Sequence, residues 1–233
     1  MKKGVSITKE LLKTNEITSK YFEKIESRKF ELFLKFFMDK LFALILLLLL
    51  LPLIIVLAVW IKLDSTGPVF YRQERVTQYG RVFKIFKFRT MVTDADKVGS
   101  LVTIGKDNRI TQVGHIIRKY RLDEIPQLFN VLMGDMSFVG VRPEVQKYVD
   151  YYTDEMLATL ILPAGITSPA SIAYKDEDNV LEKYCLQGYS PDEAYVQKVL
   201  PEKMKYNLEY IRNFGIISDF KVMIDTVVEV IGD

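Results

Sequence analysis

The stretch LFALILLLLLLPLIIVLAVWI, which runs from Leu41 to Ile61, contains no charged or amide side chain and carries Pro52 at its middle. An apolar run of about 20 residues is long enough to cross the ~30 Å hydrocarbon core of a bilayer as a helix. A central proline removes one backbone hydrogen bond and kinks or breaks that helix. The stretch therefore ties the chain to a lipid phase, either as a kinked span or as a re-entrant helix.

Basic residues flank the apolar stretch on both sides. They are Lys29, Lys35 and Lys40 before it and Lys62, Arg72, Arg75, Arg81, Lys84, Lys87 and Arg89 after it. A spanning helix would place its flanks in opposite compartments, with Lys and Arg enriched on the cytoplasmic side only. We therefore predict a re-entrant helix over residues 36–62 that is broken at Pro52, with both ends cytoplasmic. The ordinary kinked span is the alternative.

Composition excludes several classes of function. The chain has 233 residues and a net charge of only +2, so it is not a nucleic-acid binder by charge. Its basic residues gather beside the apolar segment, where anionic headgroups would attract them. With Cys185 and His115 as the single cysteine and histidine, an intramolecular disulfide is excluded and a His/Cys zinc site is disfavoured. Any metal is expected to be a hard cation, Mg²⁺ first, held by carboxylates and phosphates.

Periodicity predicts an α+β fold that is mainly helical with a small β-hairpin, anchored by the re-entrant helix and by amphipathic interfacial helices. Residues 1–35 read as an amphipathic extension, which either lies on the membrane surface or docks on the body. Residues 63–233 are expected to form a cytoplasmic domain that carries the chemistry. Two alternating runs around residues 77–80 predict the hairpin.

Further along, residues 92–108 read as a loop or short helix. Helices are then expected over residues 116–120, 124–133, 148–162, 179–187, 191–214 with an interruption at Pro201, and 218–231. The first of the longer ones should be capped by Asp123 and end at Gly134. The last carries an apolar stripe that suits either a core or a membrane-lying face.

Asp123 and Glu124 are adjacent at this predicted helix start, with Arg118 upstream and Arg142 downstream. Backbone N–H groups and the helix dipole would favour negative charge there, and an aspartate can attack phosphorus as a covalent nucleophile. Mg²⁺ between the carboxylates and a diphosphate would neutralise their repulsion, and arginine forks clamp phosphate oxygens. As an isolated pair, the two carboxylates are more often explained by helix capping and first-turn charge.

The wider string is far more specific. RKYRLDEIPQLFNVLMGDMSFVGVRPE, residues 118–144, closely resembles the signature of the bacterial sugar transferases, small monotopic phosphoglycosyl transferases that start glycoconjugate assembly on polyprenyl phosphate. The resemblance extends to the apolar segment with its proline, to KIFKFRTM at 84–91 and to LPAGIT at 162–167. It covers roughly residues 36–233.

The resemblance implies the reaction and its residues. A sugar 1-phosphate would pass from a UDP-sugar to undecaprenyl phosphate with release of UMP, at the cytoplasmic face of the bacterial inner membrane, through a covalent phosphosugar–aspartate intermediate. Asp123 would be the nucleophile and Glu124 its partner, both near Mg²⁺. The residues assigned to substrate phosphate and nucleotide are Arg118, Arg142, Pro143 and Arg89. Rival readings are direct attack by the lipid phosphate, with Asp123 only holding Mg²⁺, and a membrane-anchored scaffold.

Three departures from the family pattern matter. The re-entrant helix of the family commonly bends at Ser-Pro, whereas this chain has Leu51-Pro52. Val141 replaces the first proline of a Pro-Arg-Pro element. The segment GITSPASIAYKDEDN, residues 165–179, differs from the usual Gly-Ile-Thr-Gly, and because it is expected near the sugar, no sugar is assigned. The glycan pathway and any homo-oligomer are also left open.

Overall fold

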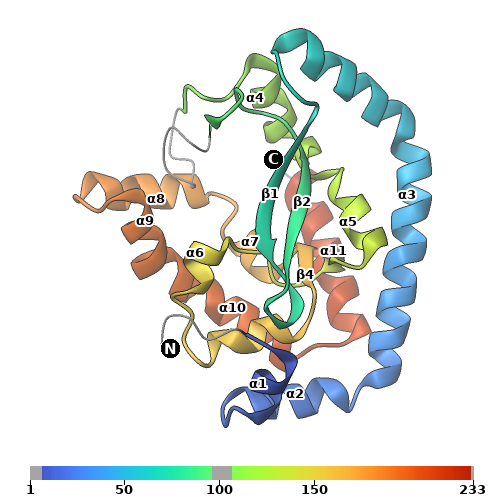
Figure 1. The fold of residues 1–233 in the computed structure, drawn as a ribbon, viewed down its shortest axis with the longest axis vertical. Helices are drawn as coiled ribbons and strands as arrows, with labels where there is room; N and C mark the ends of the chain where they lie inside the picture. The colour runs from blue at the N-terminus through green and yellow to red at the C-terminus, as the bar shows by residue number, and fades with distance from the viewer. Residues whose placement is uncertain (1–6, 96–106, 232–233) are drawn as a thin grey trace.

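Helices surround two small two-stranded sheets, and one helix, α3, runs along the whole side of the molecule (Figure 1). This computed structural model describes residues 7–95 and 107–231. Most of the segment predicted as a loop over residues 92–108 lies outside the described residues. The predicted mainly helical fold with a small antiparallel hairpin and one long apolar helix is confirmed.

The N-terminal helices dock on the body of the protein. They are α1 (Lys9–Thr14) and α2 (Thr18–Glu26), and the side chains that they bury in the main core are Leu12, Phe22 and Ile25. The Tyr21 hydroxyl also donates to Glu155 at 2.6 Å. Of the two roles left open for residues 1–35, the described part takes the docked one.

The long helix α3 (Lys29–Asp64) is continuous through Pro52, which corrects the predicted break in the backbone. The fixed φ of proline suits a helix, and the ring costs one N–H bond while the flanking bonds persist. The helix also begins seven residues before the predicted segment. It is the one helix among the described residues that is long and apolar enough to cross a membrane.

The same body contacts α3 near both of its ends. Near its start, Lys35 Nζ donates to Asp219 Oδ2 at 2.6 Å and to the Val139 carbonyl at 2.9 Å. At its end, Arg89 binds carbonyls of the last turn and beyond. The apolar side chains exposed on its outer face include Phe33, Phe37, Leu44, Ile45, Leu48, Leu49, Ile55, Val56 and Val59. A face of this kind requires an apolar partner. Because both ends of α3 contact the same body of the protein, the structure favours the prediction that both ends lie on the same side of the membrane.

The predicted hairpin is confirmed as β1 (Phe70–Val76) and β2 (Val82–Phe88), paired antiparallel with Phe70 opposite Phe88. Tyr79, at φ 58°, makes the turn between them. Phe83 and Ile85 alternate on the inward face of β2, and Phe88 at the end of the strand is also buried. All three share a core with Leu47, Leu57 and Ile61 of α3. The long apolar helix and the hairpin are therefore parts of one packed unit.

The chain then builds a second sheet that the sequence did not predict. After α4 (Gln112–Lys119), η3 (Leu122–Glu124) and α5 (Gln127–Met133), strand β3 (Met136–Val139) pairs in parallel with β4 (Ala164–Thr167). Each strand has four residues, too few to show a clear alternation. Gly134 ends α5 in the left-handed conformation, at φ 78°, as predicted.

The remaining helices are α6 (Gln146–Val149), η4 (Met156–Ile161), α7 (Pro169–Ala173), α8 (Glu177–Leu186), α9 (Pro191–Ala194), the π-helical η5 (Tyr195–Val199), α10 (Leu200–Arg212) and α11 (Ile216–Ile231). The single helix predicted over residues 148–162 is wrong, because the Thr153 hydroxyl accepts from the Met156 N–H and starts a new turn. The interruption predicted at Pro201 is confirmed as the π-helical turn just before it.

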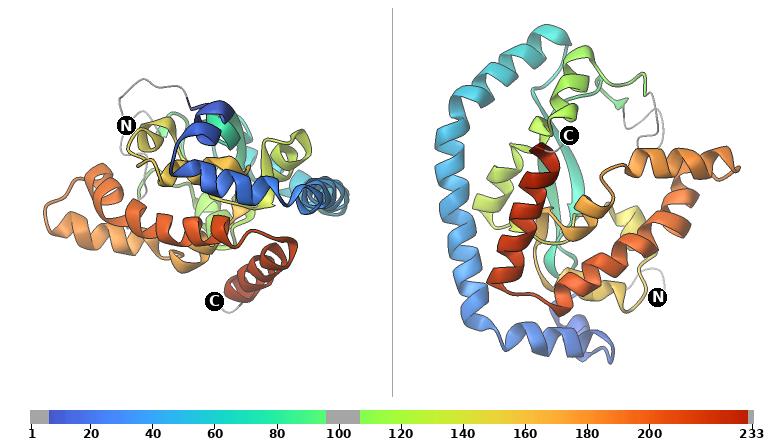
Figure 2. Two further views of the ribbon diagram at one scale, coloured as in Figure 1. Left: turned by 90° about the horizontal axis from the view of Figure 1, so that it is seen from below. Right: turned by 180° about the vertical axis from the view of Figure 1, so that it is seen from behind.

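Helix α11 crosses the back of the molecule (Figure 2). Its inner face places Asp219 and Val222 in the protein interior. Its outer face exposes Ile217, Phe220, Ile224, Val227 and Val228. An interfacial role for this helix stays a prediction.

Arg89 closes the end of α3. Its guanidinium donates to the carbonyls of Ser65 and Thr66 at 2.6 and 2.7 Å, so it satisfies backbone acceptors that a helix end leaves open. Gly67 adopts φ +126°, and a Cβ there would lie 1.9 Å from Arg89 Nη1. Only glycine therefore lets the chain turn this closely around the guanidinium.

Replacing Arg89 with Met keeps the bulk but removes these charge-assisted bonds. Because each contributes about 1.5–3 kcal/mol, we expect the free energy of unfolding, measured by denaturation in detergent, to fall by about 3 kcal/mol. The control is Arg81→Met, which removes a pair with Asp135 from a side chain that is 52% exposed; this should cost about 1 kcal/mol or less. Equal losses would contradict the capping role.

The topology of α3 can be tested with single cysteines in a Cys185→Ser background. Lys29→Cys and Thr66→Cys place exposed thiols at the two ends of the helix. We expect both to resist a membrane-impermeant maleimide added to intact cells, and both to react after lysis. Labelling of one end from the periplasm would establish a span and exclude the re-entrant topology.

Candidate active site

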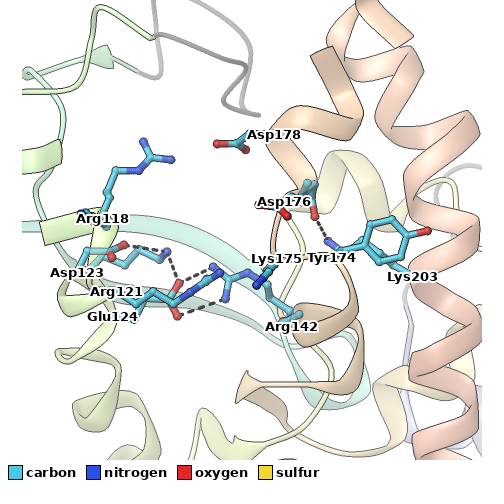
Figure 3. Close-up of a pocket in the computed structure, with 14 residues that line it drawn as sticks. Arg118, Arg121, Asp123, Glu124, Arg142, Tyr174, Lys175, Asp176, Asp178 and Lys203 are labelled. Atoms are coloured by element: carbon cyan, nitrogen blue, oxygen red, sulfur yellow. Dashed lines mark hydrogen bonds and ion pairs between the residues drawn. The ribbon is translucent and has the colours of Figure 1, made fainter. Parts of the chain in front are cut away.

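A polar pocket of about 440 Å³ lies between η3 and the start of α8 (Figure 3). Its described lining has seven basic side chains, Lys87, Arg118, Lys119, Arg121, Arg142, Lys175 and Lys203, and five acidic ones, Asp123, Glu124, Asp176, Glu177 and Asp178. The excess of two positive charges favours a dianion such as a diphosphate. The pocket brings together four predicted site residues, namely Asp123, Glu124, Arg118 and Arg142.

The two carboxylates project from a 3₁₀ turn rather than from a helix cap. The turn is entered through Arg121 at φ 52°, a left-handed conformation that is costly for a residue with a side chain. Pro126 has no N–H to bond the Leu122 carbonyl, so the α-helix begins only at Gln127. The prediction that Asp123 caps this helix is therefore wrong.

Glu124 is held by two cations. Arg142 clamps both of its oxygens, with Nη2 at 2.5 Å from Oε1 and Nη1 at 3.4 Å from Oε2. Lys87 Nζ donates to the same Oε1 at 2.9 Å. Burial alone would raise the pKa of the Glu124 carboxyl, but the two cations hold that pKa well below its usual range. Glu124 is therefore ionised and fully paired.

Asp123 is left much less engaged. Its one ion pair among the described residues joins Oδ2 to Lys87 Nζ at 3.5 Å, and it accepts no hydrogen bond there. Burial raises the pKa of the Asp123 carboxyl, Glu124 adds to the rise, and Lys87 opposes it. Adjacent carboxylates thus differ sharply: one is committed to cations, and the other is available to an incoming ligand.

The small sheet places Arg142 beside Glu124. Gly140 and Gly165 approach so closely that a Cβ on Gly165 would lie 2.1 Å from the Gly140 nitrogen. The Gly165 N–H donates to the Val141 carbonyl at 2.9 Å, which fixes the chain just before Arg142. The β3–β4 pairing therefore holds the Arg142 guanidinium in position next to Glu124.

Arg118 and Asp178 face one another across the pocket (Figure 3). Burial raises the pKa of the Asp178 carboxyl, and Arg118 opposes that rise. The wall from α4 and η3 thus carries Arg118, Lys119 and Arg121 beside the two carboxylates, and the wall at the start of α8 carries Asp176, Glu177 and Asp178. The second wall belongs to the segment expected near the sugar.

Two predicted residues lie elsewhere. Arg89 does not line the pocket, because its guanidinium caps α3; this corrects its assignment to substrate phosphate. Pro143 lies behind the pocket, where its carbonyl accepts from Arg75 Nη1 at 3.1 Å. His115 is exposed and outside the pocket lining.

The carboxylates suit Mg²⁺ only together with a ligand. Among the described residues, no group of three or more His, Cys, Asp or Glu side chains is arranged to hold a metal. Mg²⁺ usually binds through one or two carboxylates plus waters and substrate phosphates. Asp123 has the coordination capacity that such a site needs, whereas both oxygens of Glu124 are occupied by Arg142.

Sequence reasoning gave no role to two lysines of this site. Lys87 lies in the quoted run KIFKFRTM, on a basic hairpin that was expected to meet phosphate or headgroups, but nothing in the pattern singles it out from Lys84. Lys203 lies in a helical stretch 61 residues past Arg142 in the chain. Only the tertiary fold brings Lys87 to the two carboxylates and Lys203 to Glu177 in the opposite wall.

Comparisons with known proteins agree with this geometry. The model of the bacterial sugar transferase family matches residues 30–233. UDP-N-acetylgalactosamine-undecaprenyl-phosphate N-acetylgalactosaminephosphotransferase of Aeromonas hydrophila is 37% identical over 198 residues, covering 84% of this chain and 43% of that protein. UDP-glucose:undecaprenyl-phosphate glucose-1-phosphate transferase of Xanthomonas campestris pv. campestris is 34% identical over 195 residues, with 83% and 38% covered.

The enzyme of the same name from Escherichia coli (strain K12) is 36% identical over 195 residues, covering 81% of this chain and 38% of that protein. The chain spans roughly two fifths of the length of these three curated relatives. The family match nevertheless extends over most of it, including both carboxylates and the whole pocket. The chain belongs to the bacterial sugar transferase family.

Proposed function

We propose that the protein transfers a sugar 1-phosphate from a UDP-sugar to undecaprenyl phosphate, releasing UMP, at the cytoplasmic face of the bacterial inner membrane. Family membership and the activities named for the three relatives support this reaction class. For this chain, one observation carries the proposal: a polar pocket and an apolar pocket meet at the same wall.

The apolar pocket has a volume of about 290 Å³ and begins at Leu46 and Leu50 of α3. Its apolar lining continues through Ile125, Leu128, Phe138, Ile166 and Ile172. It shares Arg121, Glu124, Arg142, Ser171 and Lys175 with the polar pocket. An isoprenoid phosphate needs an apolar surface for its chain and cations for its phosphate, and this junction supplies both next to Asp123.

In the first step, an Asp123 carboxylate oxygen attacks the sugar-linked phosphorus. A bond forms between this oxygen and phosphorus, and the phosphorus–oxygen bond to UMP breaks, so UMP leaves with the electron pair. Arg142 and Arg118 would hold the phosphate oxygens through charge-assisted bonds. Because Glu124 is already neutralised by Arg142 and Lys87, it does not add a full uncompensated charge to the attack site.

In the second step, a phosphate oxygen of undecaprenyl phosphate attacks the same phosphorus. The bond to Asp123 breaks, the carboxylate is regenerated, and the product is a lipid-linked diphosphate sugar. Mg²⁺ is the proposed cofactor; when bound, it would neutralise diphosphate charge, with Asp123 rather than the fully paired Glu124 as the candidate protein ligand. The rival route is direct attack of the lipid phosphate on the UDP-sugar.

The two routes differ when the lipid is withheld. With Mg²⁺ and the correct member of a UDP-sugar panel, we expect one equivalent of UMP per enzyme and one sugar phosphate added to the Asp123 peptide, measured by mass spectrometry. Asp123→Asn should abolish both signals because an amide cannot attack phosphorus. The control is Asp192→Asn, outside the pocket, which should retain them. Turnover with lipid, but no UMP or adduct without it, would establish direct attack.

The acid side of the pH–rate profile tests the state of Asp123. An ionised nucleophile is required, so the rate should fall as pH drops through the pKa of Asp123, which lies above the ordinary aspartate value. Lys87→Met removes the cation that lowers the pKa of Asp123, so the acid limb of the pH–rate profile should move to higher pH. Lys84→Met, an exposed lysine of the same strand, is the control and should leave it unchanged. An unshifted limb in Lys87→Met would contradict this assignment.

A further inference from the structure

Lys203 is a buried cation in the lining of the pocket that the proposed reaction does not use. It extends from α10 and is only 4% exposed (Figure 3). Its Nζ donates to Glu177 Oε2 at 2.7 Å and to the Tyr195 hydroxyl at 3.2 Å. Glu144 Oε1 lies 3.9 Å away. A buried ammonium is retained only when it is well paired, and here three oxygens surround it.

Tyr195 continues the network toward Arg142. Its hydroxyl, fully buried, donates a short hydrogen bond to Glu144 Oε1. Glu144 follows Arg142 by two residues, and its backbone carbonyl accepts from the Val76 N–H of β1 at 2.8 Å. Arg75 binds the intervening Pro143 carbonyl. The segment that carries Arg142 is thus fixed by β1 on one side and by Tyr195 on the other.

The opposite end of the network holds the far wall of the pocket. Glu177 begins α8 and lies between Asp176 and Asp178, which line the pocket with it. Lys203 therefore ties the start of α8 to the strand-side segment around Glu144. No other ion pair among the described residues joins these two walls. One ammonium and one hydroxyl therefore make the polar link between them.

The local backbone is shaped to place Tyr195. Residues Tyr195–Val199 form a π-helical turn, and Pro201 follows in the first turn of α10. Pro201 cannot donate to the carbonyl four residues earlier, so the ladder is irregular there. Such π-turns are rare and are often found at functional sites. The turn brings Tyr195 and Lys203, one from each side of Pro201, to the same carboxylate.

We propose that Lys203 and Tyr195 are positioning residues that set the spacing between Arg142 and the α8 wall, and hence the affinity for the UDP-sugar. This inference rests on the proposed function. It predicts weaker binding of the donor in the ground state and the transition state alike. An equal loss of binding energy in the two states raises KM and leaves kcat nearly unchanged. A loss of folded protein would instead lower the active fraction, and with it the apparent kcat, without changing KM.

Tyr195→Phe is the decisive variant because it removes a hydroxyl and keeps the ring. At saturating undecaprenyl phosphate, we expect KM for the UDP-sugar to rise roughly ten- to a hundredfold, with kcat within about threefold of wild type. The matched control is Tyr148→Phe. Tyr148 is equally buried, packs against Tyr195 with 4.5 Å between the centroids of the two tilted rings, and donates to Asp192 at 2.6 Å, outside the pocket.

Tyr195→Phe removes two hydrogen bonds of a buried hydroxyl, and Tyr148→Phe removes one. Both variants should lose some thermal stability, but only Tyr195→Phe should raise KM. Lys203→Met should raise KM as well, and the double variant should be no worse than the poorer single variant because both act through one network. Equal KM values in Tyr195→Phe and Tyr148→Phe would overturn the proposal. Absence of UMP release by wild-type enzyme with every UDP-sugar would instead overturn the proposed function.

Discussion

The two ion pairs that Glu124 forms with Arg142 and Lys87 are the constraint on which the site depends. They join three distant parts of the chain: the hairpin, the 3₁₀ turn and the segment after β3. A buried carboxylate without such partners would be strongly destabilising. With these partners, Glu124 stays ionised and its oxygens stay bound to the two cations. Its neighbour Asp123 is the carboxylate that remains available to bind a substrate. The division of roles within the dyad follows from this pairing.

The same arrangement ties the long apolar helix α3 to the candidate site. Leu47, Leu57 and Ile61 of α3 pack against the inner face of the hairpin that carries Lys87. Leu46 and Leu50, from the same helix, begin the apolar pocket that reaches Glu124. The helix with the exposed apolar face therefore also forms part of the wall next to the carboxylates. A lipid-linked phosphate would approach Asp123 without leaving an apolar surface.

Much of this could be predicted from the sequence. The apolar helix, the hairpin and the grouping of Asp123, Glu124, Arg118 and Arg142 came from local patterns or from the family signature. Arg89 was misassigned because a sequence shows that an arginine is present but not which carbonyls surround it. The helix start at Asp123 was wrong because Pro126 displaces it. Lys87, Lys203 and Tyr195 acquire their roles only from contacts between segments far apart in the chain.

The central claim is that Asp123 becomes covalently linked to the sugar phosphate, and stereochemistry at phosphorus tests it most directly. A UDP-sugar with sulfur at one non-bridging position of the sugar-linked phosphorus makes that atom chiral. Each in-line displacement inverts it. Two displacements through Asp123 should give a lipid-linked product with retained configuration at phosphorus. Inversion would mean a single direct displacement by undecaprenyl phosphate and would contradict the account.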